Sequence, residues 1–205
     1  MSKAPAKLAK KTVNLDCGKY LVRTVTVDDA SDRWGGWMAD PEASQLLNSP
    51  PRVLAKSDIA AYIASFDQRT HLLLGIFEKA PEKHLGFLRV DIDPPLGRFL
   101  VSMLIGEPDA RHKGVTNDIT VPFRDYFYET LGLKTMLATA LGHNQPIIHY
   151  LLKSGWNLDK KIERHVKSNI DDTMLDLCFF SLTRDAWRAW KKANLPGPRD
   201  AARPE

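Results

Sequence analysis

The stretch Leu104-Ile-Gly-Glu-Pro-Asp-Ala-Arg-His-Lys-Gly-Val-Thr116 decides the fold, because it joins an apolar segment to an amphipathic one through a loop with a glycine and several charges. Residues 99–105 are predicted to form a strand and residues 115–130 a helix. The first N–H groups of a helix have no intrahelical partners and carry about half a positive charge. Since Gly114 permits a left-handed turn or a close backbone approach, the loop is typical of an anion-binding site.

The segments after this loop follow the order of an α/β unit. Gly132 ends the helix, residues 134–141 are predicted to form a strand, and Asn144 is placed to cap a second helix. The strand before the loop and the strand after the helix should therefore be parallel and joined by a right-handed crossover. Pro122 removes one hydrogen bond within the first helix and predicts a kink there.

Two of these segments resemble a known family. Arg111-His-Lys-Gly-Val-Thr116 resembles the (Arg/Gln)-x-x-Gly-x-(Gly/Ala) loop of GNAT acetyltransferases, and residues 144–156 resemble that family's Asn-x-x-Ala-hydrophobic-x-x-Tyr-x-Lys-x-Gly-Phe helix. The resemblance covers residues 19–191 and is strongest for the branch that acetylates ribosomal-protein N-termini and amino sugars. It implies an α/β (α+β) GNAT fold, with a mixed sheet of six to seven strands, splayed parallel central strands and helices on both faces.

The resemblance also implies that acetyl-coenzyme A is the cofactor and is bound largely by main-chain atoms. The two parallel strands would part at their C-terminal ends and leave N–H and C=O groups for the pantetheine arm. The diphosphate would lie on the loop amides, with Arg111 and Lys113 adding mobile positive charge. The predicted cofactor-binding residues are Met103, Leu104, Ile105, Arg111, His112, Lys113, Gly114, Val115, Thr116 and Asn144. Thr116 departs from the family pattern, which has Gly or Ala at this position.

The positions that the family uses for catalysis differ in this chain. Leu151 stands where the family has a tyrosine often proposed to protonate the leaving thiolate, and Thr139 stands where some members carry a carboxylate. The predicted catalytic residues are Tyr150 and Glu107, although Tyr150 lies about 100° around the helix from the family position. Two weaker candidates for the base are Asp91 and His112.

The acceptor is predicted from the resemblance and from this lack of a strong base. In the family, the helical segments near residues 30–66 cover the acceptor, so Trp34, Trp37 and Met38 are candidate substrate residues; the alternative, that they belong to the core, stays open. An α-amine loses its proton about 3.5 kcal/mol more easily than lysine at neutral pH. We therefore expect a small-molecule or peptide amine, with a protein N-terminus or an amino sugar favoured over a lysine side chain.

Composition sets the remaining expectations for the 205-residue chain, which is 26% charged and 43% hydrophobic. These values are typical of one soluble domain, and no apolar run approaches the roughly 18 residues of a membrane span. Without an apolar secretion signal, a cytoplasmic protein with no membrane partner is expected. We predict a disordered basic leader over residues 1–17, an acetyltransferase domain over 18–192 and a flexible tail over 193–205, in a monomer or homodimer.

Two other classes of function stay open at this stage. Residues 1–12 contain four lysines and no acid, while the remainder has 25 basic and 25 acidic residues. The folded body is therefore not expected to bind nucleic acid, and an RNA contact would have to use the short lysine arm. The changes at Leu151, Thr139 and Thr116 also fit a non-catalytic module that binds coenzyme A or a protein partner.

Overall fold

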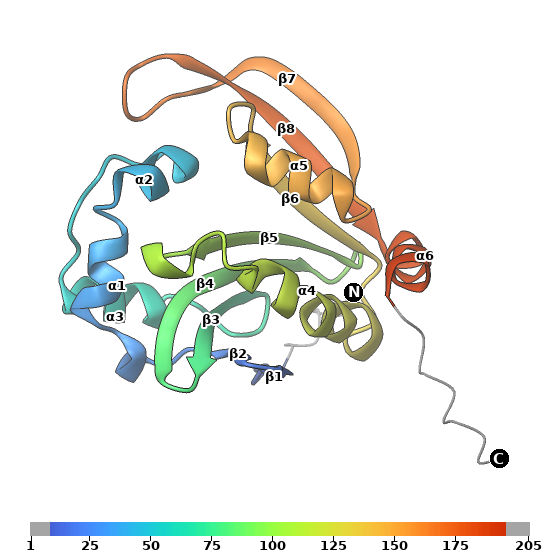
Figure 1. The fold of residues 1–205 in the computed structure, drawn as a ribbon, viewed down its shortest axis with the longest axis horizontal. Coiled ribbons are helices and arrows are strands. Elements are labelled where there is room, and N and C mark those ends of the chain that lie inside the picture. The colour runs from blue at the N-terminus through green and yellow to red at the C-terminus, as the bar shows by residue number, and fades with distance from the viewer. Residues whose placement is uncertain (1–8, 196–205) are drawn as a thin grey trace, which may run out of the picture.

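Eight strands form one mixed sheet in the order β1-β2-β3-β4-β5-β6-β8-β7 (Figure 1). The computed structural model describes residues 9–195. All neighbouring strands are antiparallel except β5 and β6, which are parallel. The strands span β1 (Asn14–Cys17), β2 (Tyr20–Thr24), β3 (His71–Lys79), β4 (Glu82–Asp93), β5 (Arg98–Ile105), β6 (Thr135–Leu141), β7 (Asn157–Lys167) and β8 (Met174–Thr183).

Helices cover both faces of the sheet, as predicted, and α1, α2 and α3 form a separate group at the left of Figure 1. The helices span α1 (Asp32–Trp37), α2 (Pro41–Leu47), α3 (Lys56–Ala64), α4 (Val115–Asp125), α5 (Gln145–Lys153) and α6 (Arg184–Asn194). Helix α4 contains Pro122 and continues as a π-helix over Tyr126–Thr130, so the predicted helix 115–130 loses its regular hydrogen bonding within one turn of the proline. Every helix in residues 9–195 falls short of the length and apolar character that a membrane-spanning helix requires.

The alternation of side chains along β3 explains why the sheet needs helices on both faces. Leu72, Leu74 and Ile76 are buried in one core, which also contains side chains from α4, α5 and α6. Leu73 and Phe77 point to the opposite face and are buried in a second core with side chains from α1, α2 and α3. Successive strand residues point to opposite faces, so a strand with apolar residues in both sets must be covered twice.

Strand β1 corrects two predictions, the number of strands and the end of the leader. Residues 14–17 pair antiparallel with β2 across the two-residue turn at Gly18 and Lys19, and Cys17 is buried. Gly18 has a φ of 72°, which suits the tight hairpin. The predicted leader therefore extended too far, and the eighth strand lies within it. Residues 1–8 of the predicted leader and 196–205 of the predicted tail lie outside the described residues. Helix α6 continues to Asn194, two residues into the predicted tail.

Candidate active site

Strands β5 and β6 pair over only three residues and then part. The aligned pairs are Arg98 with Thr135, Phe99 with Met136 and Leu100 with Leu137. Strand β5 continues to Ile105 and β6 to Leu141, so the second half of each strand has no partner in the other. The predicted splay is thus present. The remaining β5 residues, including Met103, Leu104 and Ile105, stay paired with β4 on their other edge.

The helices that follow these strands are joined at their C-terminal ends. The Arg124 guanidinium of α4 donates to the main-chain oxygen of Ser154, just after α5, at 3.2 Å and to its hydroxyl at 3.3 Å. One turn earlier, the hydroxyl groups of Thr120 and Tyr150 lie 2.6 Å apart. The N-terminal ends of α4 and α5 instead follow the parting ends of β5 and β6 (Figure 1). Strand ends and helix starts therefore diverge together on the same side of the sheet.

The loop at residues 111–116, which we call the 111–116 loop, presents open main-chain donors at the start of α4. His112 and Gly114 adopt left-handed conformations with φ of 60° and 79°, and Gly114 is the N-cap. The N–H groups of Arg111 and Lys113 donate to the carbonyls of Pro108 and Ala110 in the preceding turn. Within residues 9–195, no acceptor receives the N–H groups of His112, Gly114, Val115 or Thr116. Such a set of amides at a helix N-terminus suits an anion.

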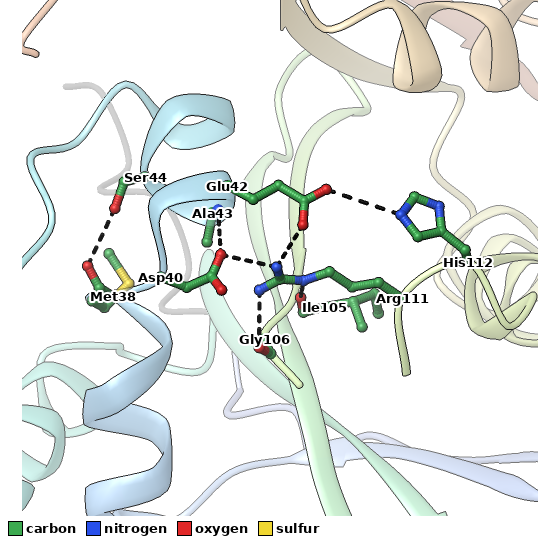
Figure 2. Close-up of polar contacts among 9 residues, drawn as sticks. All are labelled: Met38, Asp40, Glu42, Ala43, Ser44, Ile105, Gly106, Arg111 and His112. Carbon is green, nitrogen blue, oxygen red and sulfur yellow. Dashed lines mark hydrogen bonds and ion pairs between the residues drawn. The ribbon is translucent and has the colours of Figure 1, made fainter. Parts of the chain in front are cut away.

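The side chain of Arg111 does not behave as the mobile cation that was predicted. Its Nη1 atom donates to Asp40 Oδ1 at 2.9 Å and to Glu42 Oε2 at 2.8 Å (Figure 2). Its Nε donates to the carbonyl of Ile105 at 3.0 Å, and its Nη2 donates to that of Gly106 at 3.1 Å. With 11% of the side chain exposed, the guanidinium is held by protein groups on all sides. The guanidinium is therefore not free to contact a phosphate, and the N–H of Arg111 already donates to the carbonyl of Pro108.

Of the other loop side chains, those of His112 and Lys113 are exposed. His112 is 81% exposed, and its Nε2 lies 4.0 Å from Glu42 Oε1. Lys113 is exposed, while Val115 is buried in the core beside α4 and can offer only its amide. The carbonyl of Thr116 accepts from the Thr120 hydroxyl at 2.6 Å. Beyond the loop, Asn144 caps α5 by accepting from the N–H of Ile147 at 3.3 Å, as predicted.

Glu107 is buried just after the end of β5 and has three side-chain partners. Its carboxylate accepts from Trp37 Nε1 at 3.0 Å and from Lys83 Nζ at 2.6 Å, and Arg33 Nε lies 3.6 Å away. Burial alone would raise the pKa of Glu107, but the bonds from Lys83 and Trp37 and the charge of Arg33 outweigh it and lower this pKa below its ordinary value. A carboxylate so stabilised in its charged form is a weak base.

Asp91, a weaker candidate for the base, lies closer to the point where the strands part. It pairs in register with Leu100, the last β5 residue aligned with β6, and lines a surface hollow with Leu100 and Leu137. Its carboxylate bonds His71 Nδ1 at 2.8 Å and Arg89 Nη2 at 2.9 Å. Sequence reasoning missed this cluster, because pairing between β3 and β4 brings His71 and Asp91 together from positions 20 apart.

The predicted acceptor residues are placed mainly in the second core. Trp34 and Trp37 are 1% and 3% exposed, and Trp34 stacks on Phe87 with ring centroids 5.4 Å apart. Met38 packs at the edge of the same core. Both tryptophans are therefore packing residues, which argues against direct contact with an acceptor. The C-terminal end of α2 instead faces the hairpin of β7 and β8. Its C-cap Asn48 donates to the carbonyl of Lys167 at 3.0 Å and accepts from the N–H of Asn169 at 2.8 Å.

Comparison with known proteins identifies the fold that carries this arrangement. Residues 19–157 match the family model described as the acetyltransferase (GNAT) domain, whereas no curated protein matches the chain. A GCN5-related N-acetyltransferase from Brucella melitensis superposes with a TM-score of 0.73 at 16% identity, covering 89% of this chain and 84% of that one.

Two further solved structures have more specific names. The ribosomal-protein-S5-alanine acetyltransferase from Vibrio fischeri has a TM-score of 0.69 at 16% identity, covering 85% of this chain and 98% of that one. The spermidine N-acetyltransferase from Vibrio cholerae, solved with CoA and spermine, has a TM-score of 0.71 at 12% identity, covering 83% and 98%. At these identities the likeness concerns the fold, and the two differ in the amine they are named for.

Proposed function

The chain belongs to the GNAT acetyltransferase family, and on that premise we propose that it transfers the acetyl group of acetyl-coenzyme A directly to a primary amine. The observation that carries this proposal is the parting of β5 and β6 after Leu100 and Leu137, next to a loop whose amides are open. We further propose that the amine is a protein N-terminus or an amino sugar in preference to a lysine side chain.

The residues present fit coenzyme A through main-chain groups. The β6-facing edge of β5 after Leu100 offers peptide groups to an amide-rich pantetheine arm, much as a sheet edge accepts another strand. The open amides of the 111–116 loop suit the diphosphate, and the exposed side chains of His112 and Lys113 lie on the same loop. When bound, acetyl-coenzyme A supplies an activated acetyl thioester, and the chain supplies the surface that orients it.

Three of the candidate residues for proton transfer are engaged by other protein groups. Glu107 and Asp91 already bond cations, and the hydroxyl of Tyr150 bonds Thr120. Main-chain N–H groups near Leu104 or Ile105 can polarise a carbonyl oxygen, as oxyanion-hole donors do. With these two carboxylates already paired with cations, the amine has to arrive largely uncharged. This condition favours an α-amine, whose pKa is near 7.8, over lysine, whose pKa is near 10.4.

A thiol-release assay with matched peptides tests this proposal. One peptide carries a free N-terminus and an acetylated lysine, and its partner carries an acetylated N-terminus and a free lysine. At a pH of about 7.5 the uncharged fractions of the two amines differ by about two orders of magnitude, so the first peptide should react faster by a similar factor. Glucosamine and spermidine extend the comparison. Faster turnover of the lysine peptide at the same pH would refute the preference.

A non-catalytic coenzyme A module is the second candidate. It is favoured by Leu151, which is buried where the family has its tyrosine, and by the committed hydroxyl of Tyr150. For such a module, coenzyme A should raise the melting temperature while none of the amines releases thiol. Release of thiol from acetyl-coenzyme A in the presence of any of these amines would exclude it.

A further inference from the structure

We propose that Asp40 and Glu42 are positioning residues for acetyl-coenzyme A, which act through Arg111 to hold the 111–116 loop with its amides toward the diphosphate. This inference rests on the proposed function and deepens it. Neither carboxylate belongs to the strand or loop that carries the cofactor motif, since both lie at the start of α2 (Figure 2). We call the set Asp40, Glu42 and Arg111 the carboxylate clasp.

The clasp connects three separate parts of the chain through one guanidinium. Arginine has five N–H donors in a planar fork. Nη1 serves Asp40 and Glu42 of α2, while Nε and Nη2 serve the carbonyls of Ile105 and Gly106 at the end of β5. The backbone of Arg111 is at the same time the first residue of the loop. A single side chain therefore sets the distance between α2, the end of β5 and the loop.

The part of the loop before α4, residues 111–114, has little else to hold it in the observed conformation. His112 has a positive φ although it is not glycine, which costs about 1 kcal/mol, and its side chain is 81% exposed. The hydrogen bonds from the main chain of Arg111 and Lys113 reach only carbonyls of the preceding turn, at 3.1 and 3.4 Å. If the anchored conformation were only partly populated, the apparent affinity for a ligand of that conformation would fall by the same fraction.

The charge of the clasp argues for positioning rather than attraction. One guanidinium faces two carboxylates, so the cluster is net negative. Burial alone would raise the pKa of Asp40, but the Ala43 N–H and Arg111 lower it, so this carboxylate is charged at neutral pH. A net negative cluster repels an anionic cofactor. Coulomb forces alone therefore predict that neutralising Asp40 and Glu42 tightens coenzyme A binding, whereas the positioning role predicts that it weakens binding.

This opposition of sign makes the experiment decisive. Coenzyme A is titrated by calorimetry into the wild type and into the double variant Asp40→Asn with Glu42→Gln. Asn remains a good N-cap, so the bond from the N–H of Ala43 to residue 40, 2.8 Å long in the wild type, can be kept and α2 should still form. The matched control is Asp109→Asn, an exposed carboxylate in the turn just before the loop.

We expect the dissociation constant for coenzyme A to rise about tenfold in the double variant, and to stay unchanged or fall in Asp109→Asn. In turnover, the KM for acetyl-coenzyme A should rise while kcat and the KM for the amine change by less than about threefold, a split that general loss of structure would not produce.

If the double variant does not fold, Glu42→Gln alone, which alters a side chain 53% exposed, should weaken binding about threefold. Unchanged or tighter binding in the folded variant would overturn this inference alone. Failure of the wild type to bind coenzyme A would overturn the proposed function as well.

Discussion

The hydroxyl groups of Thr120 and Tyr150 lie 2.6 Å apart and join α4 to α5, the two helices that follow the parting strands. Thr120 Oγ1 also lies 2.6 Å from the carbonyl of Thr116. A carbonyl oxygen can only accept and a threonine hydroxyl has one hydrogen, so Thr120 donates to Thr116 and Tyr150 donates to Thr120. The phenolic proton of Tyr150 is thus held between helices, where it is not free to protonate a thiolate.

Replacing Tyr150 by Phe should therefore have a small effect on turnover. Loss of a general acid typically slows turnover by about 10²- to 10⁴-fold, whereas we expect a decrease below about tenfold and a loss of about 1 kcal/mol in the free energy of unfolding. Thr120→Val removes the same bond from the other helix and should give a similar pair of changes. A hundredfold loss in Tyr150→Phe together with near wild-type turnover in Thr120→Val would identify Tyr150 as the acid.

Glu107 is expected to contribute to stability more than to proton transfer. Glu107→Gln leaves Lys83 and Arg33 without their carboxylate, so the free energy of unfolding at neutral pH should fall by about 1–3 kcal/mol. The pKa of Glu107 is lowered in the folded state, so its contribution is full above the ordinary value of 4.5 and is lost as the pH falls through the folded value. Urea unfolding should thus show a shallower acid loss in the variant. If folded Glu107→Gln instead turns over about a hundredfold more slowly than the wild type, Glu107 acts as the base.

Sequence reasoning succeeded where the signal was local. The loop at Arg111, the helix after Gly114 and the strand after Gly132 are adjacent in the chain, so their order predicted the parallel pair. The parting of that pair was implied by the resemblance of the loop to the GNAT family. The fate of the Arg111 side chain was not predictable, since Asp40 and Glu42 are 71 and 69 positions away and no pattern links them to it. The depth of Trp34 and Trp37 was also undecided, because tryptophans can line a pocket or fill a core.

A paired glycine test examines the anion site by itself. Gly114 and Gly132 have φ of 79° and 69°, and a Cβ at either position would meet nothing within 4 Å. Alanine should therefore cost about 1 kcal/mol of stability at both, through backbone strain alone. Only Gly114 belongs to the 111–116 loop, so coenzyme A binding should weaken in Gly114→Ala and stay unchanged in Gly132→Ala. Equal affinities in two folded variants would contradict diphosphate binding at this loop.

His84 should make the protein lose stability in mild acid, above the range in which its carboxylates titrate. Its ring lies 4.3 Å from Phe77 and 4.9 Å from Trp34, between centroids, and its Nε2 donates to the carbonyl of Gly86 at 3.0 Å. Burial lowers the pKa of His84 from 6.5 to about 4. The unfolded chain then binds a proton that the folded chain excludes, so stability is full above pH 6.5 and falls as the pH drops toward 4.

The size of this loss can be stated and tested. A shift of this size corresponds to about 3 kcal/mol, at about 1.4 kcal/mol for each pH unit. His84→Phe keeps a ring in the aromatic cluster and removes the titration, so its free energy of urea unfolding should change much less between pH values of about 7 and about 4.5. His165→Phe, on the exposed face of β7, serves as the control and should keep the wild-type slope. Each variant is compared with itself at two pH values, so the pH-independent cost of leaving the Gly86 carbonyl without its donor cancels. Equal changes with pH in His84→Phe and in the wild type would show that His84 is not the titrating group.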